Sequence, residues 1–314
     1  MARPALPGRH HRRDILDQVD TSTLTPVASR MGGAVAGVRQ GLGDRLFARV
    51  AGPEGPRRRD RIHDTPGPRW FDEDAAIRRV HGDASMFVGG IRALLMQSLH
   101  PLAMAGVSDH SGFEGDPWGR LQRTSHFLAV TTFGTAADAE RMVAVVRDVH
   151  RGVVGVAPDG RAYDASDPHL LRWVHVAEID SFLAAHQRYG AEPLDGPGRD
   201  RYVAEAARVA EALGVTDPPR SEQELREHLE GYRPELEGTP AARAAARFLL
   251  LNPPLPALSR VPYAGLAASA VSLLPLWARR PLLLPHLPVT ERVLVRATGS
   301  ALTRAIRWAM SPSR

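Results

Sequence analysis

The chain has 314 residues, of which 43% are hydrophobic and 24% charged, so it can bury a sizeable core like an ordinary globular protein. Its formal charge of +5 is modest for this length, and we expect no nucleic-acid partner. The sequence contains no cysteine and no lysine, so all 40 basic residues are arginine. Disulfides, cysteine-ligated zinc, iron–sulfur clusters, covalently attached haem and lysine Schiff bases are therefore excluded. A metal site built from side chains must use His, Asp or Glu.

The N-terminal part differs in composition from the rest of the chain. Residues 1–70 are polar, rich in arginine and interrupted by Gly and Pro, which predicts a partly helical extension. Its paired arginines lack a following apolar run, so we expect no secretory signal and a cytoplasmic location. From "WFDEDAAIRRV" onward the apolar residues recur with the 3.6-residue period of a helix. Residues 71–314 are thus predicted to form a single all-α domain.

The first strong helices of this domain have recognisable ends. The segment "GGIRALLMQSLHPLAMAG" predicts a helix that stops near Pro101, because proline disrupts a continuing helix. The next helix is predicted over "DPWGRLQRTSHFLAVTTFG", with Asp116 as its N-cap and Pro117 at its first position.

The following segments continue the helical pattern. We expect a helix over "TAADAERMVAVVRDVHRGVVG", capped by Thr135 and ended by Gly155, and then a loop or small hairpin over "APDGRAYDASDP". Asp167 is expected to cap a long helix over "DPHLLRWVHVAEIDSFLAAHQRYG". Two amphipathic surface helices are predicted over "RDRYVAEAARVAEALG" and "SEQELREHLEGY".

The apolar stretch "YAGLAASAVSLLPLWARRPLLLPHLPV" near the C-terminus is broken by Pro and Arg. It never reaches the roughly 18 to 20 uninterrupted apolar residues that a membrane-spanning helix needs. It predicts buried helices and turns, with peripheral membrane contact as the alternative.

Four histidines are placed where they could bind a metal or a cofactor. His150 lies on a stripe of valines and is predicted to face the core, and His175 lies on the inner face of its helix. His100 is expected at a helix end and His110 in a loop. A histidine on an apolar stripe is more often a hydrogen-bonded core residue than a ligand, so none of the four is decisive alone.

Arg120, Arg123 and Thr124 have the spacing i, i+3 and i+4, which places their side chains on one face of a helix. On the outside of the protein such residues would simply be solvated. Facing a pocket, they would bind an anion or an oxygen ligand.

Together with a buried histidine on the next helix, this face favours haem b. Haem b needs one imidazole on the iron, hydrogen-bond donors on the opposite side and cations for its two propionates. A non-haem site is the alternative, although the paired Glu-x-x-His pattern of di-iron bundles is missing. Its candidate ligands are His100, His110, His150, His175 and Glu178.

Four segments occur in order along the chain: "ALLMQSLHPLAMAGVSDHSGF", "DPWGRLQRTSHFLAVTTFG", "VRDVHRGVVG" and "YDASDPHLLRWVHVAEIDSFLAAHQRYG". This series resembles the MpaB-type family, which joins rubber oxygenase (latex clearing protein) and the endoplasmic-reticulum-bound oxygenase of mycophenolic acid biosynthesis. The resemblance covers about residues 70 to 300. It implies an all-α fold with a globin-like core, a non-covalent haem b, and use of dioxygen to cleave carbon–carbon double bonds of isoprenoids.

By position, the resemblance implies that His150 is the axial ligand of the iron, and that Arg120 and Thr124 match the distal-side Arg and Thr of rubber oxygenase. Arg123 takes the place of a lysine that can coordinate the iron there. Because a guanidinium stays protonated, it cannot be a ligand, and the sixth position is expected to be open or filled by water. The two arginines and Thr124 would then stabilise the charge that develops on oxygen. His110, His175 and Arg120 are further candidates for cofactor contacts.

The expected function is that of a haem b-dependent oxygenase whose partners are dioxygen and a small apolar, unsaturated substrate. Two alternatives stay open: a non-catalytic haem- or gas-binding protein, and a helical scaffold without a cofactor. The sequence leaves the oligomeric state open.

Overall fold

The structure is a computed structural model that describes residues 37, 39–44, 47–110 and 116–311. Most of the predicted N-terminal extension lies outside the described residues. Its described part includes α2 (Gly55–Asp64).

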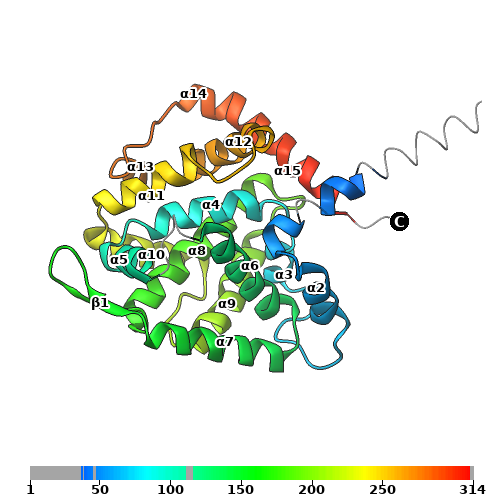
Figure 1. Ribbon diagram of the computed structural model, residues 1–314, viewed down its shortest axis with the longest axis horizontal. Helices are drawn as coiled ribbons and strands as arrows, with labels where there is room; N and C mark the ends of the chain where they lie inside the picture. The colour runs from blue at the N-terminus through cyan, green and yellow to red at the C-terminus, as the bar shows by residue number, and fades with distance from the viewer. Residues whose placement is uncertain (1–36, 38, 45–46, 111–115, 312–314) are drawn as a thin grey trace, which may run out of the picture.

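Helices make up nearly all of the regular structure of the described residues, which confirms the all-α prediction (Figure 1). After α2 the α-helices are α3 (Ala76–His81), α4 (Met86–Gln97), α5 (Pro101–His110), α6 (Pro117–Phe133), α7 (Ala136–Arg151), α8 (Pro168–Tyr189), α9 (Gly196–Leu213), α10 (Glu222–Tyr232), α11 (Pro240–Leu251), α12 (Ala257–Leu273), α13 (Leu276–Arg279), α14 (Pro288–Thr290) and α15 (Arg296–Met310). A 3-10 turn, η2 (Arg233–Glu235), follows α10, and a π-helical turn, η3 (Glu291–Val295), joins α14 to α15. The strands β1 (Val154–Val156) and β2 (Ala162–Asp164) pair antiparallel.

The predicted helix starts are confirmed by their capping hydrogen bonds. The side chain of Asp116 accepts from the backbone N–H of Gly119, and that of Thr135 accepts from Asp138. Asp167 accepts from the N–H of His169 at the start of α8. Each bond satisfies one of the backbone donors that a helix leaves unpaired in its first turn.

Of two predicted helix ends, the first is confirmed and the second is wrong. The helix α4 ends at Gln97, shortly before Pro101, as expected. Pro101 is in addition the first residue of α5, a position where a helix makes no use of the N–H that proline lacks. His110 is accordingly the last residue of α5 and not part of a loop. The helix α7 ends at Arg151 and not at Gly155, because Val154–Val156 pair with β2 in a hairpin. The suggested hairpin over "APDGRAYDASDP" is thus confirmed, starting slightly earlier than expected.

The centre of the protein is the packing of α4 against α8. Gly89 allows the two helices to approach closely, since a Cβ atom there would lie 2.9 Å from Cδ1 of Phe182. Trp173 is fully buried in this interface, and its indole N–H donates to the carbonyl of Gln97 over 3.3 Å. The main apolar core spreads from α4 and α8 to α3, α9, α10 and α12.

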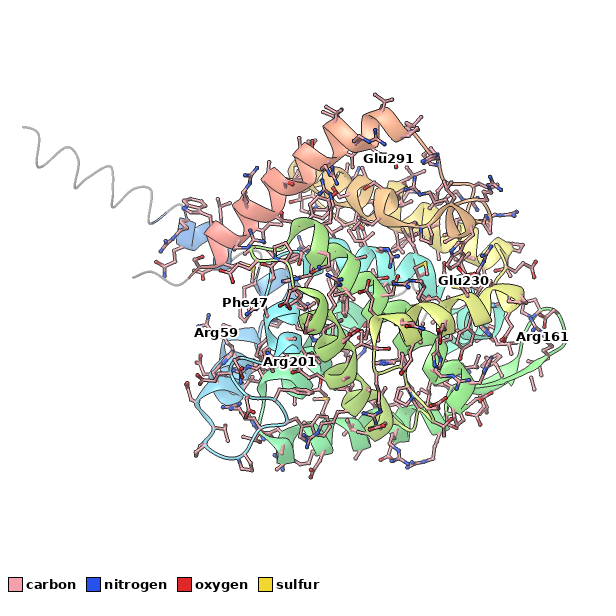
Figure 2. The ribbon with its side chains drawn as sticks, turned by 180° about the vertical axis from the view of Figure 1, so that it is seen from behind. Phe47, Arg59, Arg161, Arg201, Glu230 and Glu291 are labelled. Carbon is pink, nitrogen blue, oxygen red and sulfur yellow. The ribbon has the colours of Figure 1, made fainter. Side chains whose placement is uncertain are left out.

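The helices α11 to α15 form a layer over α4, with the hairpin at a far corner of the molecule (Figure 1). Figure 2 shows the same arrangement from behind, with Glu291 in this layer and Arg161 at the end of the hairpin. The buried side chain of Arg279 connects segments of this layer. It donates to the carbonyl of Leu274 over 2.8 Å and to the carboxylate of Glu291 over 2.7 Å.

The prediction of burial for the C-terminal apolar stretch holds only in part. Ala267, Ala270 and Leu274 are buried, but Leu283 and Val289 are 71% and 78% exposed. Around α13 and α14, Leu276 and Leu287 are exposed as well, whereas Ala278 and Leu282 are buried. Within the described residues, none of the helices combines the length and the apolarity that crossing a bilayer requires.

Candidate active-site pocket

A small pocket with a cavity volume of about 90 Å³ lies among α3, α6, α7, α8 and α9. This volume is below the roughly 300 to 1,000 Å³ of typical small-molecule sites, so the surrounding helices must move apart before a cofactor can enter. The wall is mainly apolar, with a few titratable side chains among aliphatic ones. The lining residues are Ile77, His81, Phe127, Leu128, Thr131, His150, Leu171, Val174, His175, Glu178, Ile179, Ala206, Val209, Ala210, Leu213 and Val215.

Two of the predicted histidines meet in this pocket. His150 comes from the last turn of α7 and His175 from the second turn of α8, where Leu171 and Ile179 flank it as expected. Nδ1 of His150 and Nε2 of His175 are buried and have no hydrogen-bond partner. Buried polar atoms are nearly always paired in proteins, so two unpaired ring nitrogens in one pocket call for a functional explanation.

Both imidazoles are neutral at physiological pH. Burial lowers the pKa of His150, and burial lowers the pKa of His175 to about 3. A neutral imidazole keeps a lone pair on one ring nitrogen, which is what a metal ligand or a proton acceptor needs. The pocket therefore presents two nitrogen donors against an apolar wall.

The valine stripe around His150 is less buried than its periodicity predicts. Val143 is buried, but Val149 and Val154 are 59% and 52% exposed. The reason is that α7 lies at the edge of the molecule, covered by α6 and α9 on one side (Figure 1). His150 thus lies at the boundary of the buried face, half-buried and in contact with the pocket.

Glu178 lies one turn after His175 on the same face of α8 and also lines the pocket. Burial raises the pKa of its carboxyl to about 7, so protonated and ionised forms coexist near neutral pH. Burial thus shifts the pKa values of Glu178 and His175 in opposite directions, as expected when a low-polarity site disfavours every charged form. Such perturbed groups in a cleft are typical of functional sites.

His81 belongs to a hydrogen-bonded network at the pocket wall. Its Nδ1 lies 2.9 Å from Oγ1 of Thr132, and its Nε2 lies 3.4 Å from the hydroxyl of Tyr202. Burial lowers the pKa of His81 to about 3. Because both ring nitrogens of His81 have hydrogen-bond partners, neither is available to a ligand. Ligand binding is therefore assigned to His150 and His175.

The predicted face of Arg120, Arg123 and Thr124 lies outside the pocket lining. The side chain of Arg123 is 65% exposed and forms an ion pair with Asp116 over 3.0 Å, and Thr124 is exposed as well. Arg120 is half-buried, and burial lowers the pKa of its guanidinium. Among the described residues, α6 contributes to the pocket through its later turns.

Phe127, Leu128 and Thr131 are the residues of α6 that reach the pocket, and the sequence reasoning missed them. They continue the face of Arg120 and Thr124 at helical spacing, so the signal was present in the sequence. The polar residues Arg120, Arg123 and Thr124 lie in the first turns of α6, whereas it is the later turns of this helix that line the pocket.

Of the five candidates for a non-haem site, His150, His175 and Glu178 line the pocket, whereas the other two lie elsewhere. His110 lies at the surface, where its Nε2 is 3.2 Å from the carbonyl oxygen of Val154. His100 is buried in the turn between α4 and α5 and contacts His169 and Glu235 instead of the pocket. Within the part of the chain that the structure describes, these three form the one group of His and carboxylate side chains spaced for a metal ion.

Replacing Glu178 with glutamine is expected to remove a pH dependence of stability. The folded protein holds the Glu178 proton up to about pH 7, whereas the unfolded chain releases it near 4.5. The native free energy of unfolding should therefore fall as the pH rises through this window and level off above it. Above pH 7 the Glu178→Gln variant should be more stable than the native chain by an amount on the order of 1 kcal/mol, after discounting for partial exposure.

Urea denaturation of both proteins across this pH window measures the effect. Glu192→Gln, on an exposed glutamate, is the matched control and should follow the native curve. Parallel curves for the native chain and Glu178→Gln would show that the carboxyl is in contact with water and not held in a low-polarity site.

Comparisons with known proteins agree with this architecture. The family model described as "ER-bound oxygenase mpaB/B'/Rubber oxygenase, catalytic domain" matches residues 78–308. Two uncharacterised proteins, from Mycobacterium bovis and Mycobacterium tuberculosis, are each 32% identical over 102 residues, which is 32% of this chain and 39% of each relative. No solved structure matches the chain. Since the family match includes α4 to α12 and every residue of the pocket except Ile77, the chain belongs to the family of the mpaB and rubber oxygenase catalytic domains.

Proposed function

We propose that this chain is a haem b-dependent oxygenase that uses dioxygen on a small, apolar and unsaturated substrate of the isoprenoid class. The observation that carries the proposal is the pair of unpaired imidazole nitrogens, on His150 and His175, inside an apolar pocket. Membership in an oxygenase family supports the reaction type.

The residue types of the pocket suit a non-covalent haem b, and the pocket would have to widen to take the macrocycle. His150 would be the axial ligand, because its imidazole is neutral, half-buried and lacks a partner for Nδ1. The aliphatic side chains of α8 and α9 would contact the macrocycle. When bound, the haem would supply the oxygen chemistry that cleaves a carbon–carbon double bond.

The protein side chains would then position the substrate and control protons. The apolar wall would bind the hydrocarbon substrate and exclude water, which strengthens every electrostatic interaction within the site. Glu178, with its pKa near 7, could hold a proton or release it at physiological pH. His175 would be left to accept a hydrogen bond through Nε2, since only one of the two histidines is needed as the axial ligand.

Arg120, Arg123 and Thr124 are proposed as the distal donors that stabilise negative charge on oxygen. In a dry pocket one such donor is worth on the order of 100-fold in rate. For Arg123 to take this role its side chain must leave Asp116 and turn along α6 toward Thr131.

Absorption spectroscopy combined with a turnover assay tests the proposal. The full chain, purified after haem supplementation, should show a Soret band with about one haem per protein. With squalene as an apolar polyene probe it should consume oxygen and release carbonyl-containing fragments that mass spectrometry detects. Haem binding without oxygen consumption would favour the non-catalytic haem or gas carrier, and a colourless protein would favour the scaffold.

A further inference from the structure

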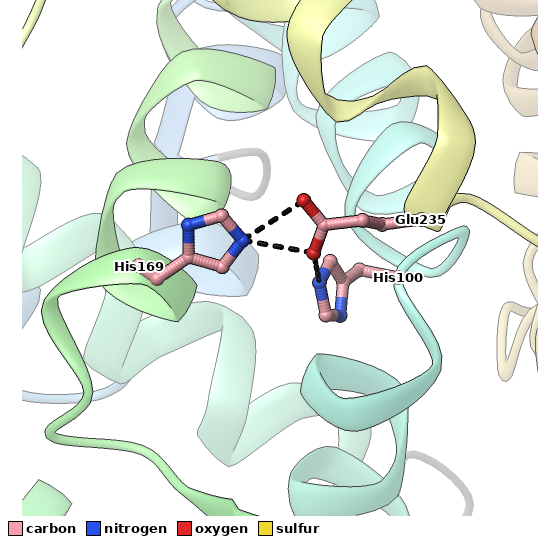
Figure 3. A group of neighbouring side chains, drawn as sticks. All are labelled: His100, His169 and Glu235. Atoms are coloured by element: carbon pink, nitrogen blue, oxygen red, sulfur yellow. Dashed lines mark hydrogen bonds and ion pairs between the residues drawn. The ribbon is translucent and has the colours of Figure 1, made fainter.

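A second group of chemically reactive side chains lies away from the pocket, where three distant segments of the chain meet (Figure 3). His100 lies in the turn between α4 and α5, His169 is the second residue of α8, and Glu235 ends η2. His169 and His100 precede Glu235 by 66 and 135 residues. None of the three lines the pocket of His150.

The two imidazoles converge on one carboxylate. Nε2 of His169 lies 2.8 and 3.0 Å from the two oxygens of Glu235, and Nε2 of His100 lies 3.4 Å from Oε2. The last distance is long for a hydrogen bond, whose N···O separation is typically 2.7 to 3.2 Å. Hydrogen bonding alone therefore does not account for the position of His100, which is 1% exposed.

The spacing of these atoms suits a metal ion. With zinc–ligand bonds of about 2.0 to 2.1 Å, two ligand atoms of a tetrahedral site lie roughly 3.3 Å apart. The ligand atoms of His100, His169 and Glu235 all lie within 4.8 Å of one another, and two of the separations are 2.8 and 3.4 Å. Small side-chain movements would place an ion at bonding distance from all three.

The donor atoms of the three side chains match a cation site, and the pKa shifts of His100 and Glu235 agree with it. Burial lowers the pKa of His100 and favours its neutral form, although Glu235 opposes this shift. Burial alone would raise the pKa of Glu235, but its contacts with His169 and His100 outweigh that effect and lower it. One carboxylate oxygen and two imidazole nitrogens make up the donor set, and this set is common for catalytic zinc.

An outer-shell partner holds one of the ligands. The hydroxyl of Tyr232 donates to the carbonyl of His169 over 2.8 Å, and its oxygen lies 3.5 Å from Nδ1 of the same residue. If Nε2 bound a metal ion, the proton of the neutral ring would be on Nδ1, on the side of this oxygen. Arg172 fixes the hydroxyl by donating to it over 3.2 Å. Such partners orient histidine ligands in metalloproteins.

The site is also accessible from solvent. The side chains of His169 and Glu235 are 42% and 38% exposed, so an ion can reach them and a water molecule can take a fourth position. The inner side is closed by Trp173 and Tyr232, whose rings pack on His100.

We propose that His100, His169 and Glu235 bind one divalent transition-metal cation, with zinc preferred because imidazole and carboxylate ligands in a tetrahedral arrangement suit it. This site is separate from the proposed haem site and does not depend on the oxygenase proposal. Because its ligands come from three distant segments, the bound ion would link the α4–α5 turn to the start of α8 and to η2.

Zinc retention by the full, untagged chain tests the proposal. The protein is equilibrated with zinc chloride, dialysed and analysed by inductively coupled plasma mass spectrometry, while the Soret band reports haem separately. We expect about one zinc per chain, and a rise in Tm of about 5 °C at a zinc concentration near 100 times Kd. His169→Ala and Glu235→Gln should each weaken zinc binding by more than about 100-fold, the upper end of the loss seen for outer-shell partners.

His286→Ala removes an exposed histidine outside the cluster and is the matched control; it should retain zinc like the native chain. Circular dichroism checks that the two ligand variants keep their helices. Loss of zinc from the native chain during dialysis would contradict the proposal. Retention of zinc by both ligand variants would contradict it as well. Neither result depends on whether the protein binds haem, so the two proposals fail independently.

Discussion

Replacing His150 with alanine is expected to abolish stoichiometric haem binding. The substitution removes a neutral imidazole at the boundary of the pocket, whose Nδ1 has no other partner. Loss of the axial ligand should lower haem affinity by at least about 100-fold, more than the loss of an outer-shell group. The helices should survive, since His150 is half-buried at the end of α7 and no neighbouring side chain hydrogen-bonds to its Nδ1. Haem per chain from the Soret band and helix content from circular dichroism measure both effects.

Two further histidine variants make this test specific. His110→Ala is the matched control, because His110 lies at the surface and contacts the Val154 carbonyl outside the pocket. It should keep its haem. His175→Ala should keep haem as well but shift the spectrum, since Nε2 of His175 belongs to the same pocket. Normal haem content in His150→Ala together with loss in His175→Ala would assign the iron to His175.

Replacing Asp180 with alanine is expected to cost the largest amount of stability. Asp180 forms an ion pair with Arg92 over 2.6 Å, and the Arg92 side chain is only 5% exposed at the centre of the α4–α8 interface. Arg92 also donates to the hydroxyl of Ser181 over 2.7 Å and to the carbonyl of Leu273 over 3.1 Å, which links α8 to α12. Removing the carboxylate leaves a buried positive charge without compensation, which typically costs about 3 to 5 kcal/mol.

Urea denaturation of Asp180→Ala measures the loss. Asp148→Ala is the matched control, because Asp148 also pairs with an arginine, Arg151, but both side chains are exposed. Its free energy of unfolding should change by less than about 1 kcal/mol, as for other surface ion pairs. The double variant Arg92→Met with Asp180→Ala should lose less stability than Asp180→Ala alone, since it leaves no uncompensated charge. Equal losses for Asp180→Ala and Asp148→Ala would contradict the assigned role of the buried pair.

Features that depend on neighbours in the sequence could be predicted from the sequence. Asp116, Thr135 and Asp167 begin helices because each caps a backbone N–H two or three residues ahead, an interaction that needs no tertiary partner. The inward placement of His175 follows from the helical period in the same way. Family membership was also visible in the order of the motifs, and the match to residues 78–308 confirms it.

Two features could be seen only in the tertiary structure: which part of a helix face is buried, and which distant segments of the chain come together. The period of α6 places Arg123 and Thr131 near one face, but the packing of α6 against α7 and α3 buries Thr131 and leaves Arg123 exposed. The period cannot show this, since it gives the direction of a side chain and not what lies opposite it. The meeting of His100, His169 and Glu235 is out of reach of any local pattern, because chain segments 66 and 135 residues apart come together only when the whole core packs.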